Sequence, residues 1–236
     1  MNGIINIYKP TGISSFKCLS IVKRELVKLH GSPIKIGHLG TLDPAACGVL
    51  VLLVGSATKL NTQLNTGTKV YRSIFTFGIE TDTLDTEGVV IANSDIIPNK
   101  TQIRAAIADL TGQVEIEVPK YSAIHINGKR AYELARDGKD FTPPKRMVSI
   151  NRFELLDDIT KDMPDFVEKP SIRPNSFAFE IECETGTYIR SLAKLLAQKL
   201  GTVAIASTII RTRVGDFDIG KSRLLNNVSK SDILPT

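Results

Sequence analysis

The sequence contains few of the residues that build zinc sites and disulfide frameworks. Its 236 residues include three histidines and three cysteines, and Cys18, Cys47 and Cys183 are widely spaced, with no Cys-x-x-Cys pair. Neither a structural zinc site nor a set of disulfides is therefore expected. The longest apolar run, Val49 to Val54, has the length of a strand, so we expect no membrane-spanning helix.

The first residues, Met1 to Lys9, also lack the basic start, apolar centre and small-residue cleavage site of a signal peptide. A cytoplasmic protein is therefore expected. The length suffices for one large domain or two small ones with a sizeable core.

Charge is distributed unevenly, although the formal net charge is only +5. Residues 1–77 carry nine Lys or Arg against two acids, residues 78–118 carry two against eight, and residues 119–146 carry seven against three. Two basic blocks thus flank an acidic one. Basic blocks attract phosphate backbones by counterion release, but a solvated surface explains the same composition equally well.

Periodicity and turn signals predict alternating strands and helices. Ser14 or Ser15 can cap a helix that runs to His30 and ends at Gly31, and Thr101 can cap a shorter helix to about Leu110. Asn127-Gly128 predicts a tight turn. Strands are expected at residues 4–8, 49–54, 70–77 (half-buried), 121–126, 176–184 and 205–214, helices also at 130–136 and 187–200, and irregular chain at 36–46, 78–88 and 157–175. This order favours an α+β fold with a mixed, largely antiparallel sheet.

The segment Gly37 to Leu50 has the strongest potential for chemistry. Asp43-Pro44 lies in a glycine-rich loop directly before a buried strand, and catalytic groups are often carried on such rigid edges. Pro44 restricts Asp43 to extended backbone. On local chemistry alone, an ordinary Asp-Pro turn is the simpler interpretation.

An ordered series of motifs resembles the TruB family of tRNA pseudouridine synthases. The glycine-rich Asp43 segment resembles the family's central motif, and the match runs from about Asn6 to Phe217. The other matching segments are Lys9 to Ser15, Gly55 to Lys59, Lys69 to Tyr71, Gly78 to Asp85, Tyr121 to Ala123, Asn127 to Arg136, Thr185 to Ala193 and Arg211 to Phe217.

This resemblance implies the pseudouridine synthase fold, with a central mixed sheet flanked by helices and an RNA-gripping insertion. It implies a catalytic domain at residues 1–217, an insertion at about 111–146, and a short C-terminal tail at 218–236 in place of the RNA-binding PUA-like domain of many members. The implied reaction converts one uridine in the tRNA T-loop to pseudouridine by base flipping. No metal or organic cofactor, no membrane and no obligate protein partner is expected.

The resemblance also assigns roles to individual residues. Asp43 matches the catalytic aspartate, Arg190 its arginine partner, and Tyr71 the active-site tyrosine that stacks on the target base. His38 matches the histidine that fills the space left by the flipped base. Tyr188 and Ile209 match residues of the uracil pocket. At the position of Ile209, family members often carry leucine. Without the resemblance, Tyr71, Tyr188 and Ile209 would be assigned to the core, and Arg190 to an exposed helix start.

Basic residues at four positions are candidate RNA contacts: Lys17, Lys59, Lys129 and Arg130. His125 stands where the family usually has lysine, so one fixed charge is lost there. The acidic residues Glu80, Asp82, Asp85 and Glu87 lack a calcium-loop pattern, and we interpret them as a solvated turn.

Two other functions remain open at this point: a guide-RNA-dependent synthase acting on ribosomal RNA, and a tRNA-folding chaperone without catalysis. The chaperone would not require Asp43.

Overall fold

The computed structural model describes residues 1–65 and 67–235. These divide into two compact units, each described here by itself. Unit 1 consists of residues 1–72, 160–170 and 209–235, and unit 2 consists of residues 73–159 and 171–208. Residue 66, in the predicted catalytic domain, and residue 236, in the predicted tail, lie outside the described residues, and those domain bounds stay a prediction.

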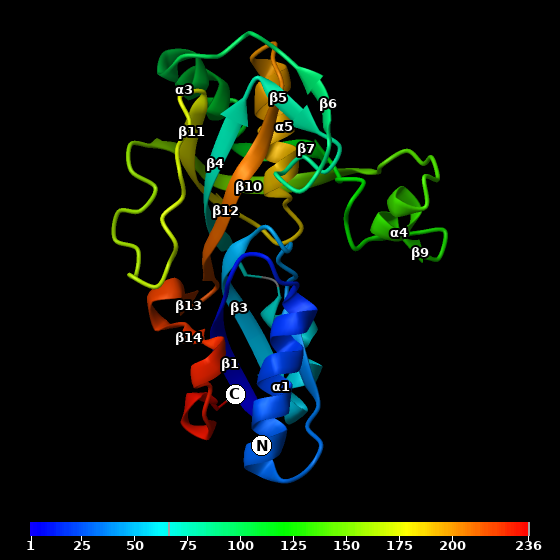
Figure 1. Ribbon diagram of the computed structural model, residues 1–236, viewed down its shortest axis with the longest axis vertical. Helices are drawn as coiled ribbons and strands as arrows, with labels where there is room; N and C mark the ends of the chain where they lie inside the picture. The colour runs from blue at the N-terminus through cyan, green and yellow to red at the C-terminus, as the bar shows by residue number, and fades with distance from the viewer. Residues whose placement is uncertain (66, 236) are drawn as a thin grey trace. The chain divides into compact units, whose positions relative to one another are not determined.

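Unit 1 is built on a small sheet with one long helix against it (Figure 1). Strands β4 and β12 contribute residues to both units. The elements of unit 1 are β1 (Gly3–Lys9), α1 (Ser15–His30), β2 (Ile36–Leu39), β3 (Cys47–Val54), the 3-10 turn Gly55–Leu60, α2 (Asn61–Leu64), the start of β4 (Lys69–Phe77), the end of β12 (Ala204–Val214), β13 (Phe217–Asp218), β14 (Arg223–Leu224) and the 3-10 turns Ile219–Lys221, Leu225–Asn227 and Lys230–Asp232.

Helix α1 forms where its sequence predicts it. The side chain of Ser14 accepts a hydrogen bond from the Lys17 N–H, and Gly31 ends the helix in the left-handed conformation. Its apolar stripe, including Val22 and Leu26, packs on the face of β1 and β3 that carries Ile5, Ile7, Leu50 and Leu52.

Strand β3 is the centre of the unit 1 sheet. It pairs antiparallel with β1 along its whole length, from Gly3↔Val54 to Lys9↔Gly48, and antiparallel with β2. Its first residues pair parallel with β12, through Ile210↔Cys47 and Arg211↔Gly48. The end of the chain adds β14 parallel to β1. Strand β3 lies between β1 and β12 and begins at Cys47. The loop that carries Asp43 therefore enters the sheet between β1 and β12.

Unit 2 contains the remaining strands, two packed helices and a projecting segment (Figure 1). Its strand order is β12-β4-β11-β10-β7. Besides parts of β4 and β12, its elements are β5 (Ile79–Thr81), β6 (Val90–Asn93), α3 (Lys100–Ala108), β7 (Gly112–Glu117), β8 (His125–Ile126), β9 (Lys129–Arg130), α4 (Ala131–Arg136), β10 (Lys145–Leu156), β11 (Ser176–Cys183) and α5 (Ile189–Lys199).

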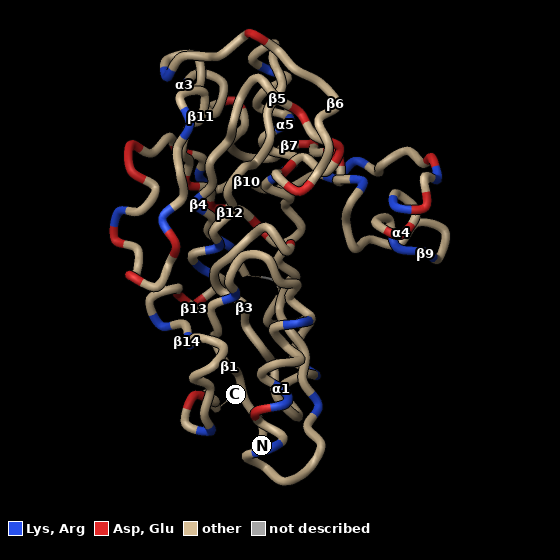
Figure 2. The backbone as a smooth tube through the Cα atoms, viewed as in Figure 1, with Lys and Arg blue, Asp and Glu red and all other residues tan. Residues whose placement is uncertain are grey.

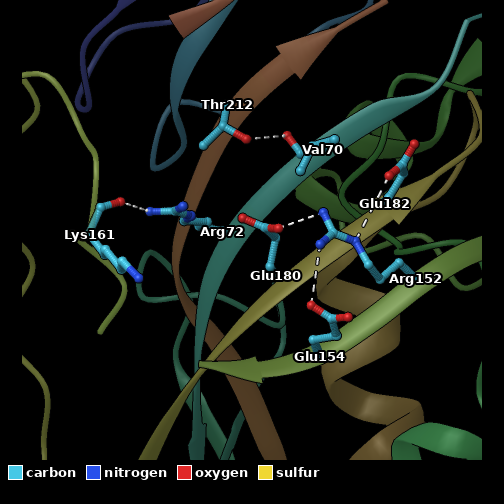
Figure 3. Close-up of polar contacts among 8 residues, drawn as sticks. All are labelled: Val70, Arg72, Arg152, Glu154, Lys161, Glu180, Glu182 and Thr212. Atoms are coloured by element: carbon cyan, nitrogen blue, oxygen red, sulfur yellow. Dashed lines mark hydrogen bonds and ion pairs between the residues drawn. The ribbon is translucent and has the colours of Figure 1, made fainter. Parts of the chain in front are cut away.

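The core of unit 2 has an aromatic centre. The ring of Phe179 lies 4.7 Å from that of Phe75 and 5.4 Å from that of Phe153, measured between centroids. On strands β10 and β11, Arg152 reaches three glutamates, Glu154, Glu180 and Glu182, which offset its charge (Figure 3). Helix α5 contributes an apolar face through Leu192 and Leu196, both fully buried.

The chain between β7 and β10 leaves the sheet and returns to it. Glu117 and Lys145 are paired across the two strands, so residues 118–144 form one closed excursion, which we call the lobe. It contains the β8–β9 hairpin and α4 and projects from the sheet of unit 2 (Figure 1). Asn127 and Gly128 both have positive φ, as the predicted tight turn requires.

The α+β class and the mixed, mainly antiparallel sheet are confirmed. Several local predictions are wrong. Residues 36–46 include strand β2, residues 78–88 include β5, and only His125–Ile126 of the strand expected at 121–126 forms. Helix α3 is capped by Asn99, two residues before Thr101, because Asn99 and Gln102 form a reciprocal capping box.

Strand β4 is buried on both faces, not half-buried. Its polar side chains find partners inside the fold, which removes the cost of burying them. Ser73 donates to the carbonyl of Thr208, and Thr76 bonds the hydroxyl of Ser207 at 2.8 Å. The polar residues Ser73 and Thr76 of β4 therefore mark hydrogen-bonded positions inside the fold and not a solvent face.

Candidate active site

Asp43 occupies the first position of a tight turn in unit 1. Its carbonyl accepts a hydrogen bond from the Ala46 N–H at 3.1 Å, and Pro44 stands at the second position, where proline is favoured. The Gly12 N–H donates to the Pro44 carbonyl at 2.9 Å, which ties the turn to the loop that follows β1. Asp43 is partly exposed, whereas Leu42 before it and Ala46 after it are buried. The Asp-Pro turn is thus real, and it presents a carboxylate on a fixed frame.

Two buried cations hold the backbone on either side of Asp43. The ammonium of Lys9 donates to the carbonyls of Pro44 and Ala46, at 3.2 and 2.6 Å. The guanidinium of Arg211 donates to the carbonyls of Gly40, Thr41 and Val49, at 3.1, 3.4 and 2.9 Å. Both side chains are at most 1% exposed. Their charges lie in a low-dielectric region, where they favour negative charge nearby.

His38 lies on β2, in the same unit as Asp43. Burial, and secondarily the charge of Arg211, lower the pKa of the imidazole below its ordinary value. Its Nδ1 is buried and has no hydrogen-bond partner among the described residues. The lowered pKa favours the neutral imidazole near pH 7.

Tyr71 on β4 and Ile209 on β12 also belong to unit 1, and both are buried. Tyr188 and Arg190 belong to unit 2, where Tyr188 is the residue before helix α5. The predicted pair of Asp43 and Arg190 joins residues of different units and stays a prediction. So do the roles expected for Tyr71, Tyr188, Ile209 and His38.

Arg190 is buried against the acidic turn of unit 2. Its guanidinium donates to the carbonyls of Thr83 and Tyr121, at 2.7 and 2.9 Å, and its Nε lies 3.7 Å from Oδ2 of Asp85. Asp85 is buried too, and its carboxylate accepts from the Thr83 hydroxyl and the Glu87 N–H. The solvated-turn interpretation is therefore wrong for Asp85, because the carboxylate is part of an internal network.

The same turn is connected to the lobe. The Tyr121 hydroxyl donates to Oδ2 of Asp82 at 3.0 Å. Leu84, at the centre of the turn, is buried with a φ of 63°, an unfavourable backbone conformation for leucine. Such strain persists only where the surrounding contacts determine the conformation.

The four predicted RNA contacts are exposed, two on each unit. Lys17 lies on α1 and Lys59 in the 3-10 turn after β3. Lys129 and Arg130 lie on the hairpin of the lobe, where Figure 2 shows basic and acidic residues close together. Arg130 also has a structural contact, since its guanidinium donates to the Ala123 carbonyl. His125 is exposed on the same hairpin.

No group of three or more metal-ligating side chains occurs in the described ranges, 1–65 and 67–235. Over the same ranges, none of the helices has the length and apolar character to cross a membrane. The three cysteines are buried thiols, and burial raises the pKa of Cys18 and Cys47. They contribute packing and not reactivity.

Residues 24–189 match the model of the TruB family pseudouridylate synthase N-terminal domain. A protein named tRNA pseudouridine synthase B from Caldicellulosiruptor saccharolyticus is 40% identical over 235 residues, which span 100% of this chain and 75% of that protein. Its namesake from Bacillus cytotoxicus is 38% identical over 93% of this chain and 68% of its own length. The chain belongs to the TruB family.

Solved structures agree with the fold of a TruB-family pseudouridine synthase. A chain from the crystal structure of a Cbf5-Nop10-Gar1 complex superposes with a TM-score of 0.65 at 24% identity. The match covers 95% of this chain and about half, 53%, of the other. At this identity, the likeness supports the fold alone.

Sequence reasoning missed four buried residues that contact the segments around Asp43 or Arg190: Lys9, Ser15, Asp85 and Arg211. Two of them carried a usable signal. Lys9 closes a largely apolar strand, and Arg211 follows Ile209-Ile210 inside another. A charged residue within a buried strand requires internal partners, so both could have been flagged as buried cations.

Proposed function

We propose that this TruB-family pseudouridine synthase converts one uridine in the T-loop of tRNA to pseudouridine. The curated relatives that cover the chain are named for tRNA. The observation that carries the proposal is the partly exposed Asp43 carboxylate, whose turn is held by buried cations on both sides. A carboxylate fixed in this way is suited to a reaction centre.

The reaction needs no redox step and adds no atom. The uracil must leave C1′, turn and rejoin through C5, and the proton on C5 must leave. Asp43 serves as the carboxylate that attacks the sugar or removes a proton from it. In this proposal Arg190 pairs with Asp43 and keeps it oriented, Tyr71 stacks on the base, and Tyr188 and Ile209 line the uracil pocket.

The target base must first be extruded from the folded loop, which costs a few kcal/mol of stacking. His38 offsets this cost by filling the vacated space, and its neutral, partly buried ring supports that role. The lobe between β7 and β10 grips the RNA stem-loop through Lys129 and Arg130. Lys17 and Lys59 contribute further phosphate contacts.

The catalytic domain is taken to span residues 1–217, with residues 111–146 as the RNA-gripping insertion and residues 218–236 as a short tail. The cytoplasm is the proposed compartment, since buried cysteines in the thiol form fit a reducing environment. We propose catalysis without a metal or organic cofactor and without an obligate protein partner.

The test uses unmodified tRNA transcript that contains 5-tritiated uridine, incubated with the purified chain alone. Release of tritium, followed by mapping of the product to a single T-loop uridine, is expected. A guide-dependent enzyme would not act on the bare transcript, and a pure folding chaperone would release no tritium. Release at many uridines, or at none, would contradict the proposal.

A further inference from the structure

The two adjacent serines at the start of α1 have different hydrogen-bond partners. Ser14 caps the helix through the Lys17 N–H and is exposed. Ser15 is 1% exposed, and its hydroxyl points away from the helix to the residue before Asp43. It donates to the Leu42 carbonyl and accepts from the Leu42 N–H, both at 2.8 Å. One side chain thus satisfies both polar groups of the Leu42 backbone.

Arg211 reaches the same loop from the opposite flank of β3. Its three donors contact three different carbonyls, two of them in the loop and one on β3. Among the described residues it contacts no carboxylate. A buried guanidinium without a counter-ion is costly, and its planar fork matches three separate acceptors as no other side chain could. The buried guanidinium of Arg211 thus serves to fix the backbone of the loop.

We propose that Ser15 and Arg211 are positioning residues that set the orientation of the Asp43 carboxylate through the backbone of residues 40–42. The inference rests on the proposed role of Asp43. Neither side chain acts on the substrate. Ser15 fixes the peptide planes next to Asp43, and Arg211 fixes those of Gly40 and Thr41.

A purely structural role is the alternative, and it has a different signature. Loss of a structural contact lowers stability but leaves the turnover of the remaining folded molecules unchanged. Loss of a positioning contact lowers the chemical rate of folded enzyme while RNA affinity is retained. A displacement of about 1 Å can reduce a rate by about 100-fold.

The adjacent serines allow a matched comparison. Ser15→Ala should lower the single-turnover rate on tRNA by about 10- to 100-fold, with the dissociation constant for tRNA within about twofold of the wild type. Ser14→Ala removes the helix cap without touching the loop, so its thermal midpoint should fall while its single-turnover rate stays at the wild-type value. Equal rates for the two folded variants would overturn the proposal.

A second pair covers the case in which Ser15→Ala does not fold. Arg211→Lys keeps the charge but cannot reach all three carbonyls, so it should also lower the single-turnover rate and leave tRNA affinity unchanged. Its control is Thr212→Val on the same strand, where the hydroxyl bonds the carbonyl of Val70 and not the loop (Figure 3). A wild-type rate for Arg211→Lys, or equal loss in both variants, would contradict the positioning role.

The activity of the wild-type protein distinguishes failure of the proposed function from failure of the positioning role. If it forms no pseudouridine on tRNA, the proposed function fails, and the positioning role fails with it. If it is active and the Ser15 and Arg211 variants match their controls, only the positioning role fails.

Discussion

The tripeptide Thr-Leu-Asp occurs twice in the chain, as Thr41-Leu42-Asp43 in unit 1 and Thr83-Leu84-Asp85 in unit 2. Around Asp43, the buried guanidinium of Arg211 binds loop carbonyls, and the carboxylate stays partly exposed. Around Asp85, the carboxylate is buried, accepts hydrogen bonds from Thr83 and Glu87, and forms an ion pair with Arg190. The same three residues therefore build a presented acid in one unit and an internal one in the other.

The two acids therefore differ in what the neighbouring cation contacts. Arg211 binds backbone carbonyls and fixes the loop that carries Asp43, whose side chain is partly exposed. Arg190 lies beside the Asp85 carboxylate itself, which is buried in unit 2. We therefore expect substitutions at Asp43 to act on turnover and substitutions at Asp85 to act first on stability.

The largest effect is expected for Asp43→Asn. The amide keeps the shape of the side chain but removes its ionisable oxygen, so the rate of pseudouridine formation should fall by about 1,000-fold or more, as for loss of a catalytic nucleophile in other enzymes. Binding of tRNA should persist in a filter-binding assay. Appreciable tritium release by the pure variant would remove Asp43 from the mechanism.

Asp85→Asn should instead lower the free energy of unfolding, by about 3 kcal/mol, because it removes a buried negative charge that lies beside the Arg190 guanidinium. Urea denaturation of the variant and the wild type measures this difference. An unchanged urea midpoint would show that the two Thr-Leu-Asp sites do not differ as described.

Lys129→Ala tests whether RNA binding can be weakened without affecting the roles of Asp43 and Asp85. The side chain is exposed on the hairpin of the lobe, so its loss should leave stability and the single-turnover rate at saturation unchanged. The slope of log affinity against log salt should become shallower by about 0.7 to 0.9, the loss of one phosphate contact. Glu133→Ala, on the adjacent α4, is the control with the opposite charge and should not make the slope shallower.

The smallest effect concerns His38 and pH. Because the pKa of the folded imidazole lies below the ordinary value of 6.5, the unfolded chain binds more protons once the pH falls below about 6.5. Stability from His38 is therefore complete above that pH and is lost as the pH falls toward the folded pKa. His38→Gln should lose less unfolding free energy than the wild type between pH 7 and 5. Parallel curves would contradict the shift.

Much of the fold could be predicted because its signals are local. The stripe of α1, the alternation of β11 and the turn at Asn127-Gly128 depend on neighbouring residues only. The strands β7 and β10 were missed, although Val114 and Ile116 alternate with polar residues along β7. Their association includes a salt bridge between Glu115 and Lys145, which lie 30 positions apart. Nothing along the sequence reports such a partner.

Part of the candidate site could also be predicted from local signals. Asp43 could be found from its turn and its family motif, whereas the buried state of Asp85 depends on Arg190, 105 residues away in the sequence. Likewise, two adjacent serines look equivalent as helix caps until the Leu42 backbone is brought against one of them.

Position 48 tolerates few residue types without a change in the geometry of the Asp43 loop. A methyl group added there would lie 2.2 Å from the carbonyl oxygen of Arg211 and 2.7 Å from its nitrogen, and the backbone of Gly48 has a φ of 112°. No rotamer change relieves a clash with main chain, so even alanine must separate β3 from β12. A library randomised at this codon and selected for activity should return glycine alone, which makes the position a marker for intact loop geometry in engineered variants.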